Sequence, residues 1–177
     1  MSFCTETLST SSSALCSSYP LNDKWVLYNH LPSEKNWTLS GYNIINDDID
    51  TVEKTIAYNK SIPDNIIKYS MLFFMRKGIS PIWEDENNKN GGCFSYKVIN
   101  KNVVQVWRHM MFLVAGESLA LNKEYNNCIN GITISPKKNF CIIKIWLRDA
   151  NHQDPQMIEN VEYLTKHGSM FKRHGEN

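Results

Sequence analysis

Apolar residues along the chain follow two spacings, and the spacing typical of strands is the more frequent. Short runs rich in β-branched and aromatic residues, bounded by polar or glycine-containing segments, indicate strands. The run YSMLFFM is continuous, which predicts a buried strand that closes at Lys77-Gly78. The predicted strands cover Lys24–Tyr28, Tyr42–Ile45, Tyr69–Met75, Cys93–Ile99, Cys128–Ile134, Phe140–Leu147 and Val161–Leu164.

Helical spacing is clearest in the segment Asn102–Ala115, where apolar residues recur every three or four positions. This stripe is typical of a helix face packed on a core. A second, shorter helix is predicted to start at the capping box Asp50-Thr51-Val52-Glu53 and to end before Pro63. Because most connections between strands are too short for helical crossovers, we expect an α+β fold with an antiparallel sheet and helices on one face.

The chain of 177 residues is expected to form one domain preceded by a tail. Residues 2–18 are mostly serine and threonine and bury too little apolar surface to fold, so residues 1–18 are predicted to be disordered. The folded domain is expected over residues 19–177. Residues at the start of the given sequence show neither a basic region nor an apolar run, so we expect no secretory signal there, and no apolar run reaches the length of a membrane span.

Charge and cysteine content exclude several classes of site. The net charge is +1, so a polyanion could be held only by a local cluster of basic residues. The five cysteines are odd in number and contain no CxxC pair, and the five histidines show no ligand spacing. The sequence therefore predicts no disulfide framework, zinc site or cofactor, and it fits a protein of the cytoplasm or nucleus.

One loop carries an unusual combination of side chains. The stretch PIWEDENNKNGG places Trp83 directly before the acids Glu84, Asp85 and Glu86. A second tryptophan, Trp37, lies on the polar loop 33–40. A single tryptophan on a loop often just covers a core edge. An indole next to a carboxylate in an acidic, glycine-rich loop indicates instead that a ligand lies against it.

Together with the turn Lys137-Lys138, these residues resemble the eukaryotic translation initiation factor 4E family, the mRNA cap-binding proteins. PIWEDENNKNGG is the most specific match, and YPLNDKW, IDTVE and GES are weaker ones. The resemblance implies a sheet curved like a cupped hand, with the cap in its concave side. It implies that Trp37 and Trp83 sandwich 7-methylguanine, that Glu84 reads the base edge, and that Trp146 packs near the methyl group.

The chemistry of the cap supports these roles. Methylation at N7 gives guanine a delocalised positive charge, so an indole gains cation–π attraction in addition to stacking worth about 1–3 kcal/mol per base. A carboxylate can accept hydrogen bonds from N1–H and N2–H of guanine together, and charge-assisted bonds are the stronger ones. Asp85 and Glu86 are expected to be solvated or to stabilise the loop through hydrogen bonds.

The phosphates of the cap require cations, and here the chain departs from the family. Lys137 and Lys138 occupy the turn, but Asn139 and Ile142 stand where further basic residues are usual, and Cys93 replaces a common arginine. Lys144 shares a strand face with Ile142 and Trp146 by period-two alternation, so it is expected to restore one charge.

The family docks a helix of a scaffold factor or of a repressor on the convex face. The matching surface is also altered here: Ile56 replaces a tryptophan, Arg108 replaces an apolar residue, and His109 replaces an acid. We expect weak binding of ordinary partner helices, and either a divergent partner helix or none. A divergent helix that does bind there is expected to carry acidic groups opposite Arg108. The predicted surface comprises Tyr19, Pro20, Leu21, Val52, Ile56, Trp107, Arg108 and His109.

Several functional alternatives stay open at this point. The chain could promote translation or repress it by occupying caps. An Mg²⁺-dependent nucleotide or cap hydrolase would use Glu84, Asp85 and Glu86, but no second acidic cluster accompanies them. A carbohydrate-binding module would not call for the lysine turn. Near the end of the chain, Thr165–Ser169 resembles a loop with a regulatory phosphorylation site at Ser169, whereas Lys166, Lys172 and Arg173 could simply neutralise RNA.

Overall fold

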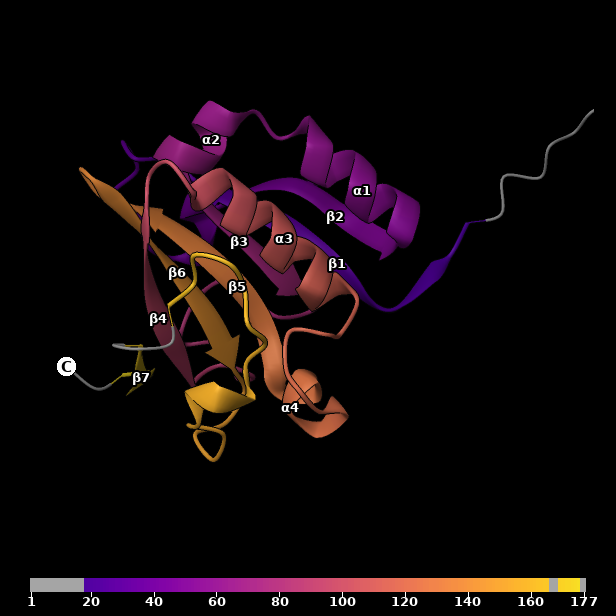
Figure 1. The fold of residues 1–177 in the computed structure, drawn as a ribbon. Helices are drawn as coiled ribbons and strands as arrows, with labels where there is room; N and C mark the ends of the chain where they lie inside the picture. Colours follow the sequence, from indigo (N-terminus) through magenta and orange to yellow (C-terminus); the bar gives the residue numbers. More distant parts are fainter. Residues whose placement is uncertain (1–17, 166–168, 176–177) are drawn as a thin grey trace, which may run out of the picture.

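The computed structural model describes residues 18–165 and 169–175. Within these residues, seven strands and four α-helices follow one another, with two short 3₁₀ turns (Figure 1). The elements are β1 (Pro20–His30), η1 (Leu39–Gly41), β2 (Asn43–Thr51), α1 (Val52–Ser61), α2 (Asp64–Tyr69), β3 (Met71–Arg76), β4 (Gly92–Ile99), α3 (Val103–Ala115), α4 (Lys123–Cys128), β5 (Ile129–Pro136), β6 (Phe140–Leu147), η2 (Pro155–Met157) and β7 (Met170–Arg173).

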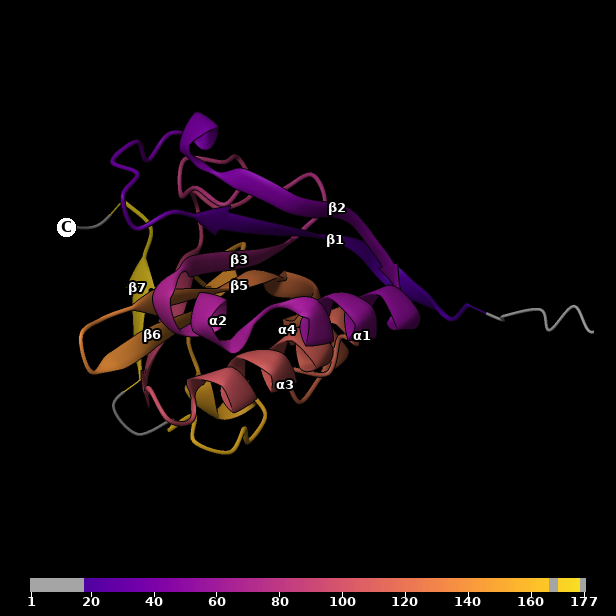
Figure 2. The same ribbon diagram turned by 90° about the horizontal axis from the view of Figure 1, so that it is seen from above.

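The strands form one curved sheet in the order β2-β1-β3-β5-β6-β4-β7, and every neighbouring pair is antiparallel. Helices α1, α2 and α3 lie together on one face of this sheet, as the view from above shows (Figure 2). The predicted α+β architecture, an antiparallel sheet with helices on one side, is therefore confirmed.

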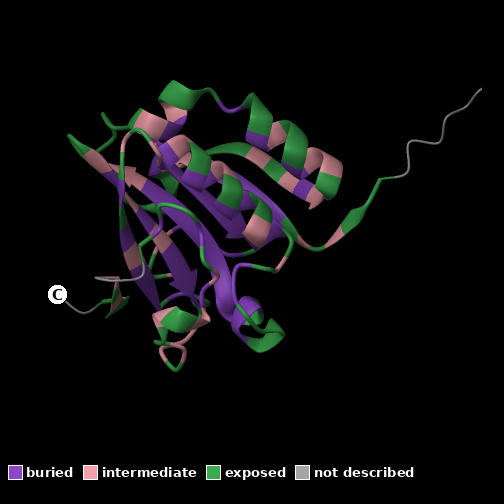
Figure 3. Cartoon of the chain, viewed as in Figure 1, coloured by how far each residue is buried: buried purple, intermediate pink, exposed green. Residues whose placement is uncertain are grey.

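The position of strand β3, buried on both faces of the sheet, explains why its sequence is a continuous apolar run. Leu72 and Phe74 point into the main core beneath the helices. Phe73 and Met75 join a smaller cluster with Trp146 on the opposite face. Because side chains alternate between the faces of a strand, a strand buried on both sides needs apolar residues at every position. Figure 3 shows the buried residues concentrated along the central strands.

The two predicted helices form, with one correction at a helix start. Asn102 precedes α3, and Trp107 and Met110 on its inner face are fully buried. Helix α1 begins one residue later than the predicted box requires, because the side chain of Thr51 caps it by accepting from the Lys54 amide at 3.2 Å. Glu53 instead accepts from the backbone amide of Tyr19, at 3.1 Å.

The structure also corrects other predicted elements. Helices α2 and α4, of six residues each, were not predicted, and Tyr69 belongs to α2 rather than to the following strand. The strand predicted over Val161–Leu164 is wrong: these residues form an irregular segment whose apolar side chains close the core. The seventh strand is β7, in a polar stretch that has no strand-like pattern.

The sequence predicted no membrane-spanning segment and no disulfide framework, and the described residues bear on both predictions. Within the part of the chain that the structure describes, no helix is long and apolar enough to cross a membrane. Cys93, Cys128 and Cys141 are buried free thiols. The predicted tail over residues 1–18 lies, apart from Ser18, outside the described residues.

Candidate functional site

The face of the sheet opposite the helices carries a cavity of about 520 Å³. Its floor is formed by side chains of strands β3, β5 and β6, and two loops rise at its edges. The loop after β1 contributes Trp37, and the loop between β3 and β4 contributes Trp83 and Glu84. The lining comprises Trp37, Tyr42, Met71, Phe73, Pro81, Ile82, Trp83, Glu84, Thr133, Ser135, Lys137, Ile142, Lys144 and Trp146.

Trp37 is held in place by a buried histidine. The rings of His30 and Trp37 are stacked, with centroids 4.2 Å apart and planes inclined by 7°. His30 donates from Nε2 to the carbonyl oxygen of Asn36 at 2.9 Å, and its ring also meets Tyr42 edge-on. Trp37 is nevertheless 55% exposed. One face of the indole is thus covered by protein, while the side chain still reaches the cavity.

The loop that carries Trp83 and Glu84 is braced by buried hydrogen bonds. The side-chain amide of Asn88 donates to the carbonyl oxygens of Ser80 at 2.9 Å and Ile82 at 2.8 Å. Asn130, from β5, donates to the Asn88 side chain at 2.9 Å and to the Asn87 carbonyl oxygen at 2.8 Å. These fully buried amides fix the loop on the sheet and leave Trp83 49% exposed at its tip.

The three consecutive acids of this loop have different roles. Asp85 accepts hydrogen bonds from the backbone amides of Ser80 and Asn87, both at 2.9 Å. Burial alone would raise the pKa of Asp85, but these bonds outweigh it and lower the pKa. Glu86 forms an ion pair with Lys89 at 2.6 Å. The prediction that Asp85 and Glu86 stabilise the loop or are solvated is confirmed.

Glu84 is the acid of this loop that lines the cavity. Burial and, secondly, the negative charge of Glu84 raise the pKa of Tyr42 to about 12. Tyr42 therefore stays a neutral hydroxyl over the physiological range, and Glu84 is the negative group at the cavity edge.

Strand β6 supplies part of the floor and one of the lysines, as its alternation predicted. Ile142, Lys144 and Trp146 all line the cavity from one face of the strand. Trp146 is largely buried and donates from Nε1 to the hydroxyl of Thr133 at 3.3 Å. Lys137, at the start of the turn, also lines the cavity, whereas Lys138 is exposed and does not.

The C-terminal strand brings further basic residues to the site. β7 pairs with β4 and places Lys172 opposite Cys93. A second cavity of about 240 Å³ adjoins the first through Trp83, Lys144 and Trp146. The lining of this second cavity is completed by Cys93, Lys172, Arg173, His174 and Gly175.

His174 was not predicted as a site residue. Its ring lies on Trp146, with centroids 4.7 Å apart. Burial and the nearby charge of Lys144 lower the pKa of His174 to about 4, against the opposing effect of a hydrogen bond with the Gly92 backbone. No local sequence pattern could have revealed this contact, because it depends on the pairing of β7 with β4.

The arrangement is suited to a flat cation attached to a chain of anions. Two exposed indoles, one carboxylate and two lysines line the same cavity. Aromatic faces attract delocalised positive charge, a carboxylate accepts from paired N–H donors, and lysines attract phosphate oxygens. Of the predicted binding residues, the cavity collects Trp37, Trp83, Glu84, Lys137, Lys144 and Trp146, and omits Lys138.

On the helix side of the sheet, an apolar groove of about 400 Å³ partly matches the predicted partner surface. Its walls come from β1, α1 and the end of α3, and Phe112 was not predicted as one of them. The lining comprises Leu21, Val52, Thr55, Ile56, Phe112, Ala115 and Gly116.

Two residues of the predicted partner surface require correction. Trp107 is fully buried in the core, so its inclusion is wrong. Arg108 does not present an uncompensated charge: it forms an ion pair with Asp64 at 2.9 Å and donates to the Ile62 carbonyl oxygen at 3.0 Å. An acidic partner opposite Arg108 is therefore not required. Tyr19, Pro20 and His109 are exposed, as expected.

Comparison with known sequences gives a consistent result. A family model described as "Eukaryotic initiation factor 4E" matches residues 20–172. Eukaryotic translation initiation factor 4E-2 of *Schizosaccharomyces pombe* is 31% identical over 152 residues, covering 80% of this chain and 58% of the relative. The 4E homolog of *Acanthamoeba polyphaga mimivirus* is 39% identical over 93 residues, covering 51% of this chain and 32% of the relative. The chain thus spans less than two thirds of these relatives' length.

Solved structures show the same fold. *C. elegans* eIF4E-3, in a complex with the 4E-binding protein Mextli and a cap analog, has a TM-score of 0.67 and 24% identity, over 76% of each chain. Schistosome eIF4E, in a complex with m7GpppG and 4E-BP, has a TM-score of 0.68 and 23% identity, over 76% of this chain and 75% of that one.

Proposed function

Because the chain belongs to the eukaryotic initiation factor 4E family, we propose that it binds the 7-methylguanosine cap of mRNA in translation initiation. One observation carries the proposal: two exposed tryptophans, a carboxylate and two lysines border a single cavity. Trp37 and Trp83 sandwich the methylated base, and Glu84 accepts from its N1–H and N2–H. Lys137 and Lys144 contact the phosphates, and Trp146 packs near the N7 methyl group.

The selectivity for the methylated base follows from charge. Unmethylated guanine stacks but lacks the positive charge that adds a cation–π contribution of about 2 kcal/mol at a desolvated indole. That difference corresponds to about a 30-fold preference for one indole face. Structures of nematode and schistosome relatives in complex with a cap analog or with m7GpppG give this assignment a precedent in the same fold.

The proposed activity is binding without turnover. A hydrolase that used the acids of the Trp83 loop would need them free to hold Mg²⁺. Asp85 is occupied by backbone amides, and Glu86 is paired with Lys89. Among the described residues, these acids form no three-ligand cluster.

A repressor that occupies caps is the second candidate function. The dorsal groove lacks the tryptophan that Ile56 replaces, and Arg108 is tied to Asp64. A family member that binds caps but recruits the scaffold factor weakly would withhold capped mRNA from initiation. The two functions share the cap site and differ in the dorsal partner.

The test is retention on a cap-analogue resin in EDTA. We expect elution by 7-methyl-GTP but not by GTP, and loss of retention for the folded variants Trp83→Ala and Trp37→Ala. Lys138→Ala serves as a control because Lys138 lies outside the cavity lining. Near-normal affinity of folded Trp83→Ala for 7-methyl-GTP would refute the sandwich.

A further inference from the structure

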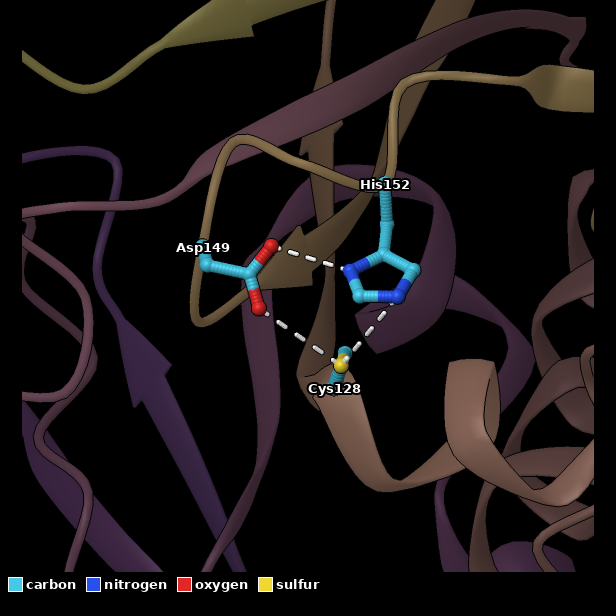
Figure 4. Close-up of side chains that lie close together, drawn as sticks. All are labelled: Cys128, Asp149 and His152. Carbon is cyan, nitrogen blue, oxygen red and sulfur yellow. Dashed lines mark hydrogen bonds and ion pairs between the residues drawn. The ribbon is translucent and has the colours of Figure 1, made fainter.

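Three side chains of different chemistry converge at the end of the sheet beside α4. Cys128 is the last residue of α4, and Asp149 and His152 belong to the loop that follows β6. Cys128 Sγ lies 3.6 Å from Asp149 Oδ2 and 3.9 Å from His152 Nε2. His152 Nδ1 lies 2.9 Å from Asp149 Oδ1 (Figure 4). None of the three lines the cap cavity.

The hydrogen bonds of this cluster fix its protons. A carboxylate oxygen can only accept, so neutral His152 carries its proton on Nδ1 and turns a lone pair on Nε2 toward Cys128. The thiol has one proton for two neighbouring acceptors, Asp149 Oδ2 and His152 Nε2. At least one lone pair in the cluster is therefore left without a donor from these three groups.

A cysteine nucleophile activated by histidine and aspartate is the first alternative to consider. Such a nucleophile needs a thiolate, and hence a lowered pKa. Here burial, and secondly the charge of Asp149, raise the pKa of the Cys128 thiol. The carboxylate also faces the sulfur directly, which opposes its ionisation. The cluster is thus poorly suited to covalent catalysis.

A divalent cation satisfies all three groups at once. Sulfur at about 2.3 Å and nitrogen at about 2.0 Å from tetrahedral Zn²⁺ are separated by about 3.5 Å, and sulfur and oxygen by a similar distance. The observed separations of 3.9 Å and 3.6 Å need only small side-chain shifts to reach these values. One ligand atom from each residue lies within 4.8 Å of the others. A set of thiolate, imidazole and carboxylate ligands favours zinc over Mg²⁺ or Ca²⁺.

The surrounding contacts hold the ligands in place. The backbone amide of Asn151 donates to Asp149 Oδ1 at 2.8 Å. The ring of Tyr125 packs edge-on against His152, and its hydroxyl donates to the His152 carbonyl oxygen at 2.8 Å. The amide of Arg148 donates to the Cys128 carbonyl oxygen at 2.9 Å, which joins the two segments that supply the ligands. Such supporting contacts are typical of metal sites.

From this geometry we propose that Cys128, His152 and Asp149 form a Zn²⁺ site. Cys128 Sγ, His152 Nε2 and Asp149 Oδ2 are its ligands, and the fourth position is taken by water. Binding releases the thiol proton to solvent, since a coordinated thiol is deprotonated. His152 and Asp149 are partly exposed, with side-chain accessibilities of 22% and 29%, so the ion can enter from solvent. The bound ion links the α4–β5 junction to the loop after β6.

The test uses the full chain after treatment with EDTA and a thiol reductant. Co²⁺, a spectroscopic substitute for Zn²⁺, is added and then displaced by Zn²⁺. We expect a thiolate-to-cobalt charge-transfer band at one equivalent, loss of the band on adding Zn²⁺, and a higher Tm with Zn²⁺. The Cys128→Ala and His152→Ala variants should lose the band and the Tm shift. His152 lies in a loop, so its variant keeps the test valid if Cys128→Ala does not fold.

Matched controls separate this site from other thiols. Cys141→Ala and Cys93→Ala remove buried thiols elsewhere in the sheet and should keep the cobalt band. Absence of the band in the unmodified chain would overturn the proposal, and so would its survival in Cys128→Ala or in His152→Ala. Retention on the cap resin is measured in parallel. We expect it to be unchanged by His152→Ala, so that failure of the metal site and failure of cap binding are distinguishable.

Discussion

The imidazole of His30 lies parallel to the indole of Trp37, with ring centroids 4.2 Å apart. The histidine is 1% exposed at the end of β1, while the tryptophan is 55% exposed in the loop that follows. A rigid buried ring thus orients an exposed one that lines the cavity. The relationship makes His30 a positioning residue for the proposed cap site, although it does not line the cavity itself.

Replacing His30 by alanine should weaken 7-methyl-GTP binding by about 2- to 10-fold, because an aromatic pair is worth about 0.5–1.5 kcal/mol. His30→Phe keeps a stacked ring but loses the hydrogen bond to Asn36, so it should bind more tightly than His30→Ala. Fluorescence titration of both variants, with melting curves to verify folding, measures the effect. Equal affinities for His30→Ala and the unmodified chain would contradict the positioning role.

Removing the Asn88 amide should both destabilise the fold and weaken cap binding. Asn88→Ala leaves the carbonyl oxygens of Ser80 and Ile82 and the amide of Asn130 without this partner. Each buried polar group left unpaired costs about 1–3 kcal/mol. Urea unfolding and cap titration measure the two effects. The exposed neighbour Asn90 provides the control: if Asn90→Ala weakens cap binding as much as Asn88→Ala, the buried network does not explain the loop geometry.

The phosphate contacts should depend on Lys137 and Lys144 and not on Lys138. In the unmodified chain, affinity should rise from the mono- to the triphosphate of 7-methylguanosine and fall with added salt, since exposed lysine–phosphate contacts are screened. Lys144→Ala and Lys137→Ala should each reduce that gain. Lys138→Ala, which changes the same charge outside the cavity lining, should leave it nearly intact. A larger loss for Lys138→Ala than for Lys144→Ala would show that the phosphates take another path.

The dorsal groove should gain affinity for a partner helix when an aromatic anchor is restored. A peptide with the motif Tyr-x-x-x-x-Leu-hydrophobic should bind the unmodified chain weakly. An interface hot spot is worth about 2 kcal/mol or more, so Ile56→Trp should bind about 30-fold more tightly. Calorimetry measures both, with Lys60→Trp as a control on the exposed side of the same helix. Tight binding by the unmodified chain would show that the groove needs no tryptophan.

Acid should weaken the contact between His174 and Trp146. The pKa of His174 is lowered to about 4, from 6.5. Between these two pH values the released histidine binds a proton and the packed histidine does not. The equilibrium constant for packing His174 on Trp146 therefore falls as the pH drops from about 6.5 toward 4, by up to about tenfold per pH unit. Above pH 6.5 this equilibrium constant does not change with pH.

This prediction can be measured by NMR titration of the His174 ring and the Trp146 indole N–H. The His174 midpoint should lie well below 6.5, and the Trp146 resonance should move over the same range. His174→Phe, which keeps a ring but cannot be protonated, should remove the pH dependence. A His174 midpoint at or above 6.5 would contradict the packed, neutral histidine.

Local patterns in the sequence were sufficient to predict an element where the physical cause of that element is itself local. The predicted strand Phe140–Leu147 agrees with β6 at both ends, because alternation and a turn define it. The helix predicted over Asn102–Ala115 forms with Asn102 as its N-cap. The shared strand face of Ile142, Lys144 and Trp146 also follows from period-two geometry alone.

The motifs that match the family more weakly contain residues whose contacts stabilise the fold. Glu117, from GES, forms an ion pair with the buried Arg76 at 3.1 Å, and Asp23, from YPLNDKW, pairs with the same guanidinium. Glu53, from IDTVE, binds the amide of Tyr19. The sequence could show that these motifs resemble the family, but it could not separate residues that hold the fold from residues that line the cavity.

By itself the sequence determined the fold class, through local alternation and helical spacing, and its motifs showed the resemblance to the family. Through that resemblance it named some of the side chains that border the cavity, including Trp37, Trp83 and Glu84. Only the tertiary structure decided which residues from distant segments meet. It buried Trp107, which had been placed on the partner surface, and it set His174 on Trp146. It also brought Cys128 to Asp149 and His152, which carry no recognisable ligand spacing. Such contacts depend on strand order and loop path, which no local periodicity encodes.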